Sequence, residues 1–285
     1  MAKRRILVVL SDEHAGHRLC LCNPEAEWDD FSADGEPCAN KANLTRTQEW
    51  YWEGHEWGRK EVKKLAGRDE ITLIHNGDIT WGQKYPDGLI AYEQSAQVDI
   101  AFWNLKPWLD MKNVKVVRMM HGTQSHEYGT GSSTKAVTSL IAARYPKLDI
   151  AHRRHALFSI DGVSIDVAHH GTTAGIRQWT TGNQLRYYMR SLMNDELARS
   201  RPIPRLMFRA HYHTYVWETL RMGTEHVMDG FITPAFAGMT HYASQATRSA
   251  YLQGLGMIAI EIVDGEYRGA YPFIRHADLR TEEEL

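Results

Sequence analysis

Two histidines with one residue between them follow the apolar run 206–208, in the segment Arg209-Ala210-His211-Tyr212-His213. Residues i and i+2 of an extended strand point to the same side, so His211 and His213 can converge on one point. Imidazole nitrogens that converge in this way are metal ligands. A chain of 285 residues with 15 histidines produces some such pairs by chance, so the pair indicates a metal site only if other ligands join it.

Asp or His residues also follow four other apolar runs, which end near residues 10, 75, 120 and 168. Ligand sites in layered α/β proteins form beyond the carboxyl ends of strands, where loops converge on a rigid edge. We therefore expect the polar residues after these runs to share one site with the histidine pair. The collected candidates are Asp12, His14, Asp78, His169 or His170, His211 and His213.

This set supplies two carboxylates and four imidazoles, which is more than one tetrahedral metal site uses. A two-metal centre would use all of them. Mixed oxygen and nitrogen ligands suit Mn²⁺, Fe or Zn²⁺, whereas ligands that were all oxygen would have indicated Mg²⁺ or Ca²⁺. We expect two divalent ions, with Mn²⁺ the first choice and Fe, Zn²⁺, Ni²⁺ or Mg²⁺ as alternatives.

The elements that must position these residues are strands that alternate with helices. The run 6–10 has no alternation, as expected for a strand buried on both faces. Residues 15–48 have little periodicity and are interpreted as a long loop, and Pro107 is expected to end the second helix. We expect one domain over 1–285 with an insertion at about 15–67. Helices are expected over 47–65, 91–106, 134–143 and 183–199, and hairpins at Asp161-Gly162 and Asp264-Gly265.

Composition places the chain among ordinary globular proteins, with 43% hydrophobic residues and a formal net charge of −2. That charge creates no global field for nucleic acid or membranes. No apolar stretch is long enough to span a bilayer, and the first ten residues are interpreted as a strand rather than a signal peptide. Cys20, Cys22 and Cys38 are interpreted as reduced thiols rather than zinc ligands with His17, so a cytoplasmic location is expected.

The order of the motifs, DxH, GD, GTxxH, HH and HxH, resembles the calcineurin-like metallophosphoesterase superfamily over roughly residues 6–236. The segments Gly122-Thr123-Gln124-Ser125-His126 and Thr233-Pro234-Ala235-Phe236 are similar to a subgroup met in phage and prophage genomes. The resemblance implies a mixed α/β (α+β) fold, a two-sheet β-sandwich flanked by helices in four αββα layers. It also implies a metal-dependent phosphoric ester hydrolase that uses a hydroxide shared between the two metals.

Carried over by motif, the resemblance assigns Asp12, His14 and His213 to the first metal and makes Asp78 the bridging ligand. His169 and His211 would hold the second metal, with His170 as the alternative to His169. Thr123 stands where the family has asparagine, so the Thr123 hydroxyl, Gln124 or water must substitute for the missing amide oxygen. His126, displaced by two positions, is the candidate for facing the substrate phosphate and for protonating the leaving oxygen.

The substrate class stays open between a phosphodiester, in particular DNA or a nucleotide, and a phosphomonoester. Residues 177–209 contain seven arginines against Asp195 and Glu196, so Arg177 and Arg209 are candidates for substrate binding. A solvated helix face explains the same residues equally well. A third alternative is a metal-binding module whose catalysis decayed at Thr123. His241 lies in a loop that could reach the site, and the oligomeric state is not predicted.

Overall fold

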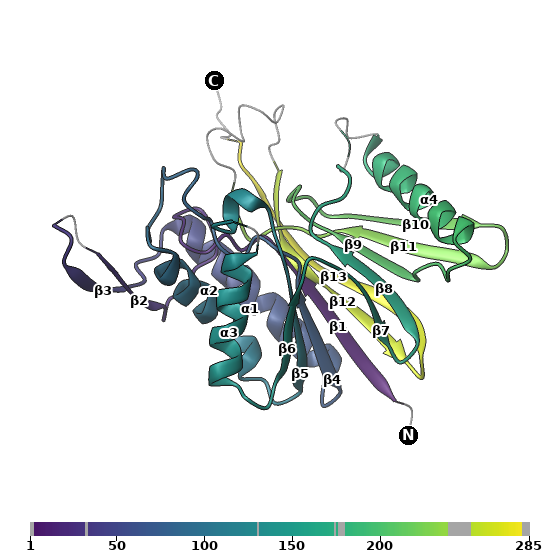
Figure 1. Ribbon diagram of the computed structural model, residues 1–285, viewed down its shortest axis with the longest axis horizontal. Coiled ribbons are helices and arrows are strands. Elements are labelled where there is room, and N and C mark those ends of the chain that lie inside the picture. The colour runs from purple at the N-terminus through teal and green to yellow at the C-terminus, as the bar shows by residue number, and fades with distance from the viewer. Residues whose placement is uncertain are drawn as a thin grey trace.

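Two mixed β-sheets pack face to face in the computed structural model, which describes residues 3–31, 34–129, 131–173, 175, 180–238 and 252–280 (Figure 1). The first sheet has the strand order β13-β12-β1-β4-β5-β6 and the second has β10-β11-β9-β8-β7. The first comprises β1 (Arg4–Leu10), β4 (Glu70–His75), β5 (Val114–Met120), β6 (Asp149–Arg153), β12 (Leu252–Val263) and β13 (Glu266–Asp278). The second comprises β7 (His155–Ile160), β8 (Val163–Ala168), β9 (Leu206–Arg209), β10 (Val216–Met222) and β11 (His226–Ile232).

Strand β1 shows why the sequence has an unbroken apolar run there. Leu7 and Val9 enter the core between the two sheets, where they meet Ile165, Phe208 and other residues of the second sheet. The alternate residues Ile6, Val8 and Leu10 enter the core between the first sheet and its helices. Because successive side chains point to opposite faces, a strand in the middle of this arrangement needs apolar residues at every position.

Helices cover the outer face of each sheet, so the fold has four layers, αββα, as expected (Figure 1). Over the first sheet lie α1 (Arg46–Ala66), α2 (Gln94–Leu109) and α3 (Ser132–Arg144); over the second lies α4 (Asn183–Ala198). Helix α1 begins with a capping box, in which Thr45 and Gln48 each bind the other's backbone N–H, and Gly67 caps its C-terminal end. Among the described residues, no helix is long and apolar enough to cross a membrane.

Helix α2 ends two residues beyond Pro107, at Leu109, so the proline lies inside the helix and not at its end. Proline cannot donate to the carbonyl four residues earlier, which here belongs to Trp103. The side-chain amide of Asn23 donates to this carbonyl at 2.7 Å. Asn23 therefore satisfies the acceptor that the proline leaves open, which reduces the cost of continuing the helix.

The sequence indicated a long loop over residues 15–48, but these residues are not a loop throughout. They contain a two-stranded ribbon of β2 (Glu27–Phe31) and β3 (Pro37–Lys41), which projects at one end of the molecule (Figure 1). Its attachment is through Trp28, which is buried, and through Asp30, whose carboxylate accepts from the Tyr92 N–H at 3.0 Å. The nearby Cys20, Cys22 and Cys38 are free thiols, and no cysteine of the described residues joins a group that could hold a metal.

The two sheets bring their parallel strands to the same end of the sandwich. Strands β1, β4, β5 and β6 run parallel, as do β8, β9 and β11. The backbone N–H of Asp12, just beyond β1, donates to the carbonyl of Gly77, just beyond β4. Likewise, the N–H of Ala210 beyond β9 donates to the carbonyl of His169 beyond β8. These bonds fix the segments that carry the candidate site residues against one another.

Candidate metal centre

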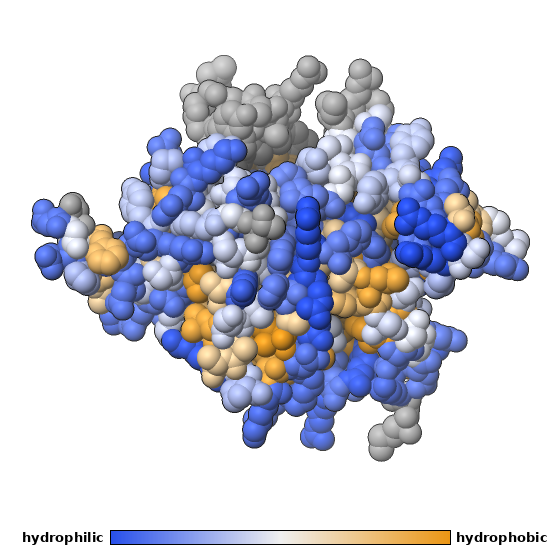
Figure 2. Space-filling model, viewed as in Figure 1, coloured by the Kyte–Doolittle hydropathy of each residue, from blue (hydrophilic) through white to orange (hydrophobic). Residues whose placement is uncertain are grey.

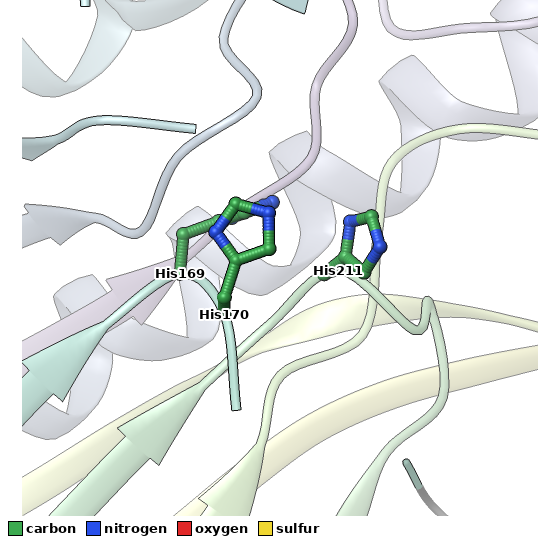
Figure 3. A group of neighbouring side chains, drawn as sticks. All are labelled: His169, His170 and His211. Carbon is green, nitrogen blue, oxygen red and sulfur yellow. The ribbon is translucent and has the colours of Figure 1, made fainter. Parts of the chain in front are cut away.

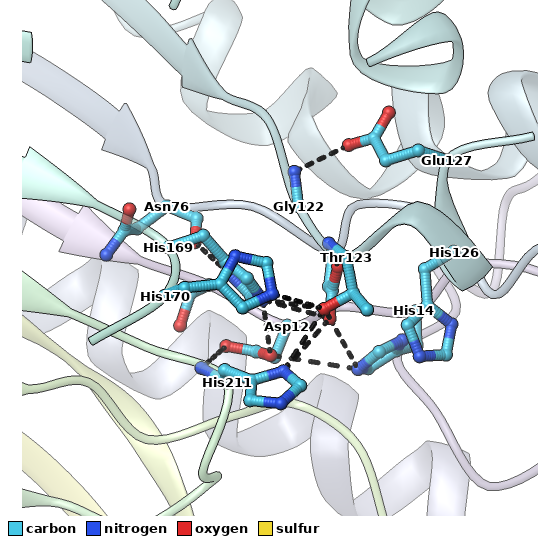
Figure 4. Close-up of polar contacts among 12 residues, drawn as sticks. Asp12, His14, Asn76, Gly122, Thr123, His126, Glu127, His169, His170 and His211 are labelled. Carbon is cyan, nitrogen blue, oxygen red and sulfur yellow. Dashed lines mark hydrogen bonds and ion pairs between the residues drawn. The ribbon is translucent and has the colours of Figure 1, made fainter. Parts of the chain in front are cut away.

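Five strand ends contribute side chains to one cluster beyond the carboxyl edge of the sandwich (Figure 4). Strands β1 and β4 supply carboxylates, β5 leads to Thr123 and His126, and β8 and β9 supply histidines. The residues that meet there are Asp12, His14, Asp78, Thr123, His126, His169, His170, His211 and His213. Their convergence agrees with the expectation from the sequence that the polar residues after these strands share one site.

A first group joins Asp12, His14 and His213, the residues assigned to the first metal. The Nε2 atoms of His14 and His213 are 3.3 Å apart. The Oδ1 atom of Asp12 lies 3.2 Å from His213 Nε2 and 3.8 Å from His14 Nε2. This oxygen is buried and has no hydrogen-bond partner, although a buried carboxylate oxygen ordinarily has one. A cation among the three side chains would satisfy it.

A second group joins His169, His170 and His211 (Figure 3). Thr123 adds its hydroxyl, which lies 3.1 Å from His211 Nδ1, 3.2 Å from His170 Nε2 and 3.3 Å from His169 Nε2. His170 therefore faces the cluster, together with His169 and not in place of it. Gln124 is exposed, and the Thr123 hydroxyl is the group that lies among the donors.

Asp78 faces both groups, as a bridging ligand must. Its Oδ2 lies 3.0 Å from His169 Nε2 and 4.0 Å from the nearest nitrogens of His14 and His211. Its Oδ1 accepts from the Thr123 backbone N–H at 2.5 Å. Asp78 is buried and also belongs to a group with His14 and His126. The shared carboxylate is the feature that joins the two groups into one centre.

The backbone at the candidate ligands is unusual, because five of them have positive φ angles. These residues are Asp12, His14, Asp78, His211 and His213, with φ between 47° and 75°. Residues other than glycine rarely adopt this conformation, and its cost is accepted mainly at functional sites. Positive φ re-aims the side chain at each of these positions. Asp12 and His14 thus both reach the site although they lie at a loop rather than in a regular strand.

Hydrogen bonds to carbonyl oxygens orient two of the imidazoles. His169 Nδ1 lies 2.6 Å from the carbonyl of Asn76, and His126 Nδ1 lies 2.5 Å from the carbonyl of Trp81. A carbonyl only accepts, so each Nδ1 must carry the proton and the Nε2 lone pair is free in the neutral ring. Metal-binding histidines commonly have such a partner behind the ring. The carbonyls of Asn76 and Trp81 hold these two imidazoles in place, and the sequence patterns did not reveal them.

The electrostatics of the centre favour positive charge. Burial by itself would lower the pKa of His169, but the carboxylates of Asp78 and Asp12 raise it to about 9. Burial would raise the pKa of Asp78, yet His169 and the other nearby imidazoles hold it well below its usual range. The centre therefore contains two buried carboxylates surrounded by imidazole nitrogens, and Oδ1 of Asp12 lacks a hydrogen-bond partner. This donor set fits divalent cations.

Gly77 keeps space open for His169, which gives a test of this arrangement. It has a φ of +91°, and a Cβ there would lie 2.4 Å from His169 Nδ1. We expect Gly77→Ala to lower the free energy of unfolding by about 1–3 kcal/mol and also to weaken metal binding, because His169 must move. Gly162→Ala is the matched control, since Gly162 has a φ of +97° with nothing near its Cβ position. Equal metal affinity in both variants, measured by equilibrium dialysis, would contradict the crowding argument.

Arg209, one of the two candidate substrate-binding arginines, does not support that role in the structure. Arg209 is fully buried, and its guanidinium pairs with Asp166 at 2.5 Å. Its stem lies against Gly171, and its guanidinium stacks over the ring of Tyr188. This burial argues against the expected contact between Arg209 and substrate, and it makes Arg209 an internal support for the β8 and β9 ends. Arg177 and His241 lie outside the described residues.

No family model matches the chain, and no curated protein sequence matches it. Among solved structures it is similar to a conserved uncharacterized protein of Streptococcus pneumoniae, a predicted phosphoesterase, at 11% identity over 95% of this chain and 98% of that chain, with a TM-score of 0.34. A Thermotoga maritima protein matches at 12% identity over 61% and 87%, with a TM-score of 0.30. The Thermus thermophilus sulfate thiohydrolase SoxB, in complex with glycerol, matches at 10% identity over 96% and 56%, with a TM-score of 0.35.

Proposed function

We propose that this chain is a metal-dependent phosphoester hydrolase of the calcineurin-like metallophosphoesterase type, with a centre for two divalent cations. The observation that carries the proposal is the carboxylate of Asp78, which both groups of donors share. It faces His14 of the first group on one side, and His169 and His211 of the second group on the other. The motif order along the chain supports the same interpretation. The phage-type subgroup remains part of this proposal.

Cations held at this centre would lower the pKa of water to near neutrality and offset the charge of phosphate oxygens. The chain itself supplies a rigid frame for that chemistry, because Asp12, His14, Asp78 and His169 are all at most 2% exposed. His211 and His213 have side chains that are each 34% exposed, so the centre opens to solvent on their side. Substrate would approach from this side.

His126 is proposed to act on the substrate and not as a required metal ligand. Its ring lies 4.4 Å from that of His14, and the carbonyl of Trp81 fixes its Nδ1. The opposite nitrogen can therefore donate a proton to a leaving oxygen when the ring is protonated. We expect His126→Ala to lower kcat by about 10²- to 10⁴-fold, the usual contribution of general acid catalysis. The metal content should stay unchanged in elemental analysis, and loss of metal would instead make His126 a ligand.

Phosphodiesters of nucleotides or nucleic acid are our first choice of substrate, and phosphomonoesters are the alternative. The surface over α4 is mainly hydrophilic (Figure 2), but several of the arginines that suggested DNA binding are paired. Arg186 binds Glu218 at 2.6 Å and Arg205 binds Asp229 at 3.2 Å, in addition to the buried Arg209. These pairs reduce the free positive charge that could follow a nucleic-acid backbone, and they favour a small phosphoester over a duplex.

An activity panel separates these alternatives. Turnover of an aryl phosphate diester and an aryl phosphate monoester is measured with Mn²⁺, Zn²⁺, Ni²⁺ and Mg²⁺, alongside cleavage and salt-dependent binding of single- and double-stranded DNA. Hydrolysis of either aryl ester that a chelator abolishes supports the proposal. Bound metal without turnover of any phosphoester would favour a metal-binding module whose catalysis was lost at Thr123.

A further inference from the structure

The second group of donors contains one more imidazole than the superfamily resemblance assigned to it. His169, His170 and His211 each direct one nitrogen into the group, and these three nitrogens lie within 4.8 Å of one another (Figure 3). In a regular strand, neighbours such as His169 and His170 would point to opposite faces. Strand β8 ends at Ala168, so the chain beyond it is free to direct both rings to the same side.

The Thr123 hydroxyl lies within hydrogen-bond distance of all these donors. It is 3.1 to 3.3 Å from the nitrogens of all three histidines and 3.1 Å from Asp78 Oδ2 (Figure 4). With bonds of about 2.0–2.2 Å to a metal, adjacent ligands lie roughly 3.0–3.4 Å apart. Each of these four donors therefore lies at the separation of an adjacent ligand from the Thr123 hydroxyl. Among the donors themselves, Asp78 Oδ2 lies 3.0 Å from His169 Nε2 and 4.0 Å from His211 Nδ1.

We propose that His170 is a ligand of the second cation, so that this position is held by three imidazoles, Asp78 and the Thr123 hydroxyl. The third imidazole takes the place of the missing amide oxygen. The two positions then differ in chemistry, since the first has Asp12 and Asp78 with two imidazoles. Nitrogen-rich sites prefer Zn²⁺ and Ni²⁺, whereas carboxylate-rich sites accept Mn²⁺ and Mg²⁺ more readily. The second position should therefore select Zn²⁺ or Ni²⁺ over Mn²⁺, in contrast to the Mn²⁺ preference expected from the sequence.

This inference rests on the two-cation centre of the proposed function but not on phosphoester hydrolysis, so its test measures metal binding without substrate. The full chain is dialysed against Zn²⁺ or Mn²⁺ alone, and bound metal is counted. The wild type should bind two Zn²⁺ ions. In His170→Ala one of the two Zn²⁺ ions, the one at the second position, should lose affinity by about 100-fold or more, because even partners outside the ligand shell contribute 10- to 100-fold. Mn²⁺ affinity at the first position should remain unchanged.

His226→Ala is the matched control, because His226 begins β11 at the opposite end of the strand from the centre. It should bind both Zn²⁺ ions as the wild type does. His170 is exposed, so its variant should unfold at the same urea concentration as the wild type. Undiminished binding of both Zn²⁺ ions by His170→Ala would overturn the proposal, and if turnover also fell, His170 would be a residue that contacts substrate. Loss of one of the two bound Zn²⁺ ions in His170→Ala, from a wild type without any phosphoesterase activity, would support this inference while contradicting the proposed function.

Discussion

Asp78→Asn is expected to lower hydrolysis of an aryl phosphodiester by about 10³-fold or more, the scale on which removal of one member of a catalytic unit acts. Asparagine has nearly the same shape, and its oxygen can still accept from the Thr123 N–H that Asp78 now binds. The fold should therefore persist. The variant loses the negative charge that faces His14 on one side and His169 on the other, so binding at both positions should weaken together.

The matched control for this substitution is Asp195→Asn, which makes the same chemical change on the exposed surface of α4. It should retain full turnover and metal content. Turnover of Asp78→Asn within a few-fold of the wild type, measured with saturating metal, would contradict the assignment of Asp78 as the bridging residue.

Arg209→Met is expected to lower the free energy of unfolding by about 3–5 kcal/mol, because breaking a buried ion pair leaves an uncompensated charge. Arg209 is fully buried, and of the described residues only His155, 2.9 Å away, would still pair with the Asp166 carboxylate. The effect should extend to the metal centre. The Arg209 carbonyl accepts from the Thr233 N–H at 2.8 Å, and the next residue, Ala210, binds the carbonyl of His169.

The double variant Arg209→Met with Asp166→Leu separates the pair from the arginine alone. Replacing both partners by apolar groups removes the unpaired charge, so stability should recover most of the loss. Urea unfolding of the two single variants and the double variant measures this difference. If Arg209→Met lowers the free energy of unfolding by less than about 1 kcal/mol, the ion pair contributes no more than an exposed pair does. That result would contradict the prediction for a buried pair.

The strands that carry the centre could be predicted because each is an apolar run that ends in Asp or His. Strand β1 is the clearest case, with both faces buried and Asp12 just beyond its end. Strand β6 and the β2–β3 ribbon were not predicted, because they contain no apolar run. Their segments, such as Asp149–Arg153, are short and polar and lie at edges or in an exposed ribbon, where hydrophobic alternation is weak.

The parts of the site that the sequence could not supply depend on backbone geometry and tertiary contacts. Residue type alone does not determine the positive φ at His211 and His213. The i, i+2 spacing predicted both histidines on an extended strand, whereas they lie beyond the end of β9 with left-handed backbone. The arginine count over 177–209 predicted a basic surface because the partners of those arginines are distant in sequence. Glu218, Asp229 and Asp166 meet them only after folding.

The most direct test of the central claim is an anomalous difference map from crystals of the Zn²⁺-loaded protein. Two peaks about 3.5–4 Å apart are expected, one among Asp12, His14 and His213 and the other among His169, His170 and His211, with Asp78 between them. A single peak, or peaks only outside this cluster, would contradict a two-cation centre.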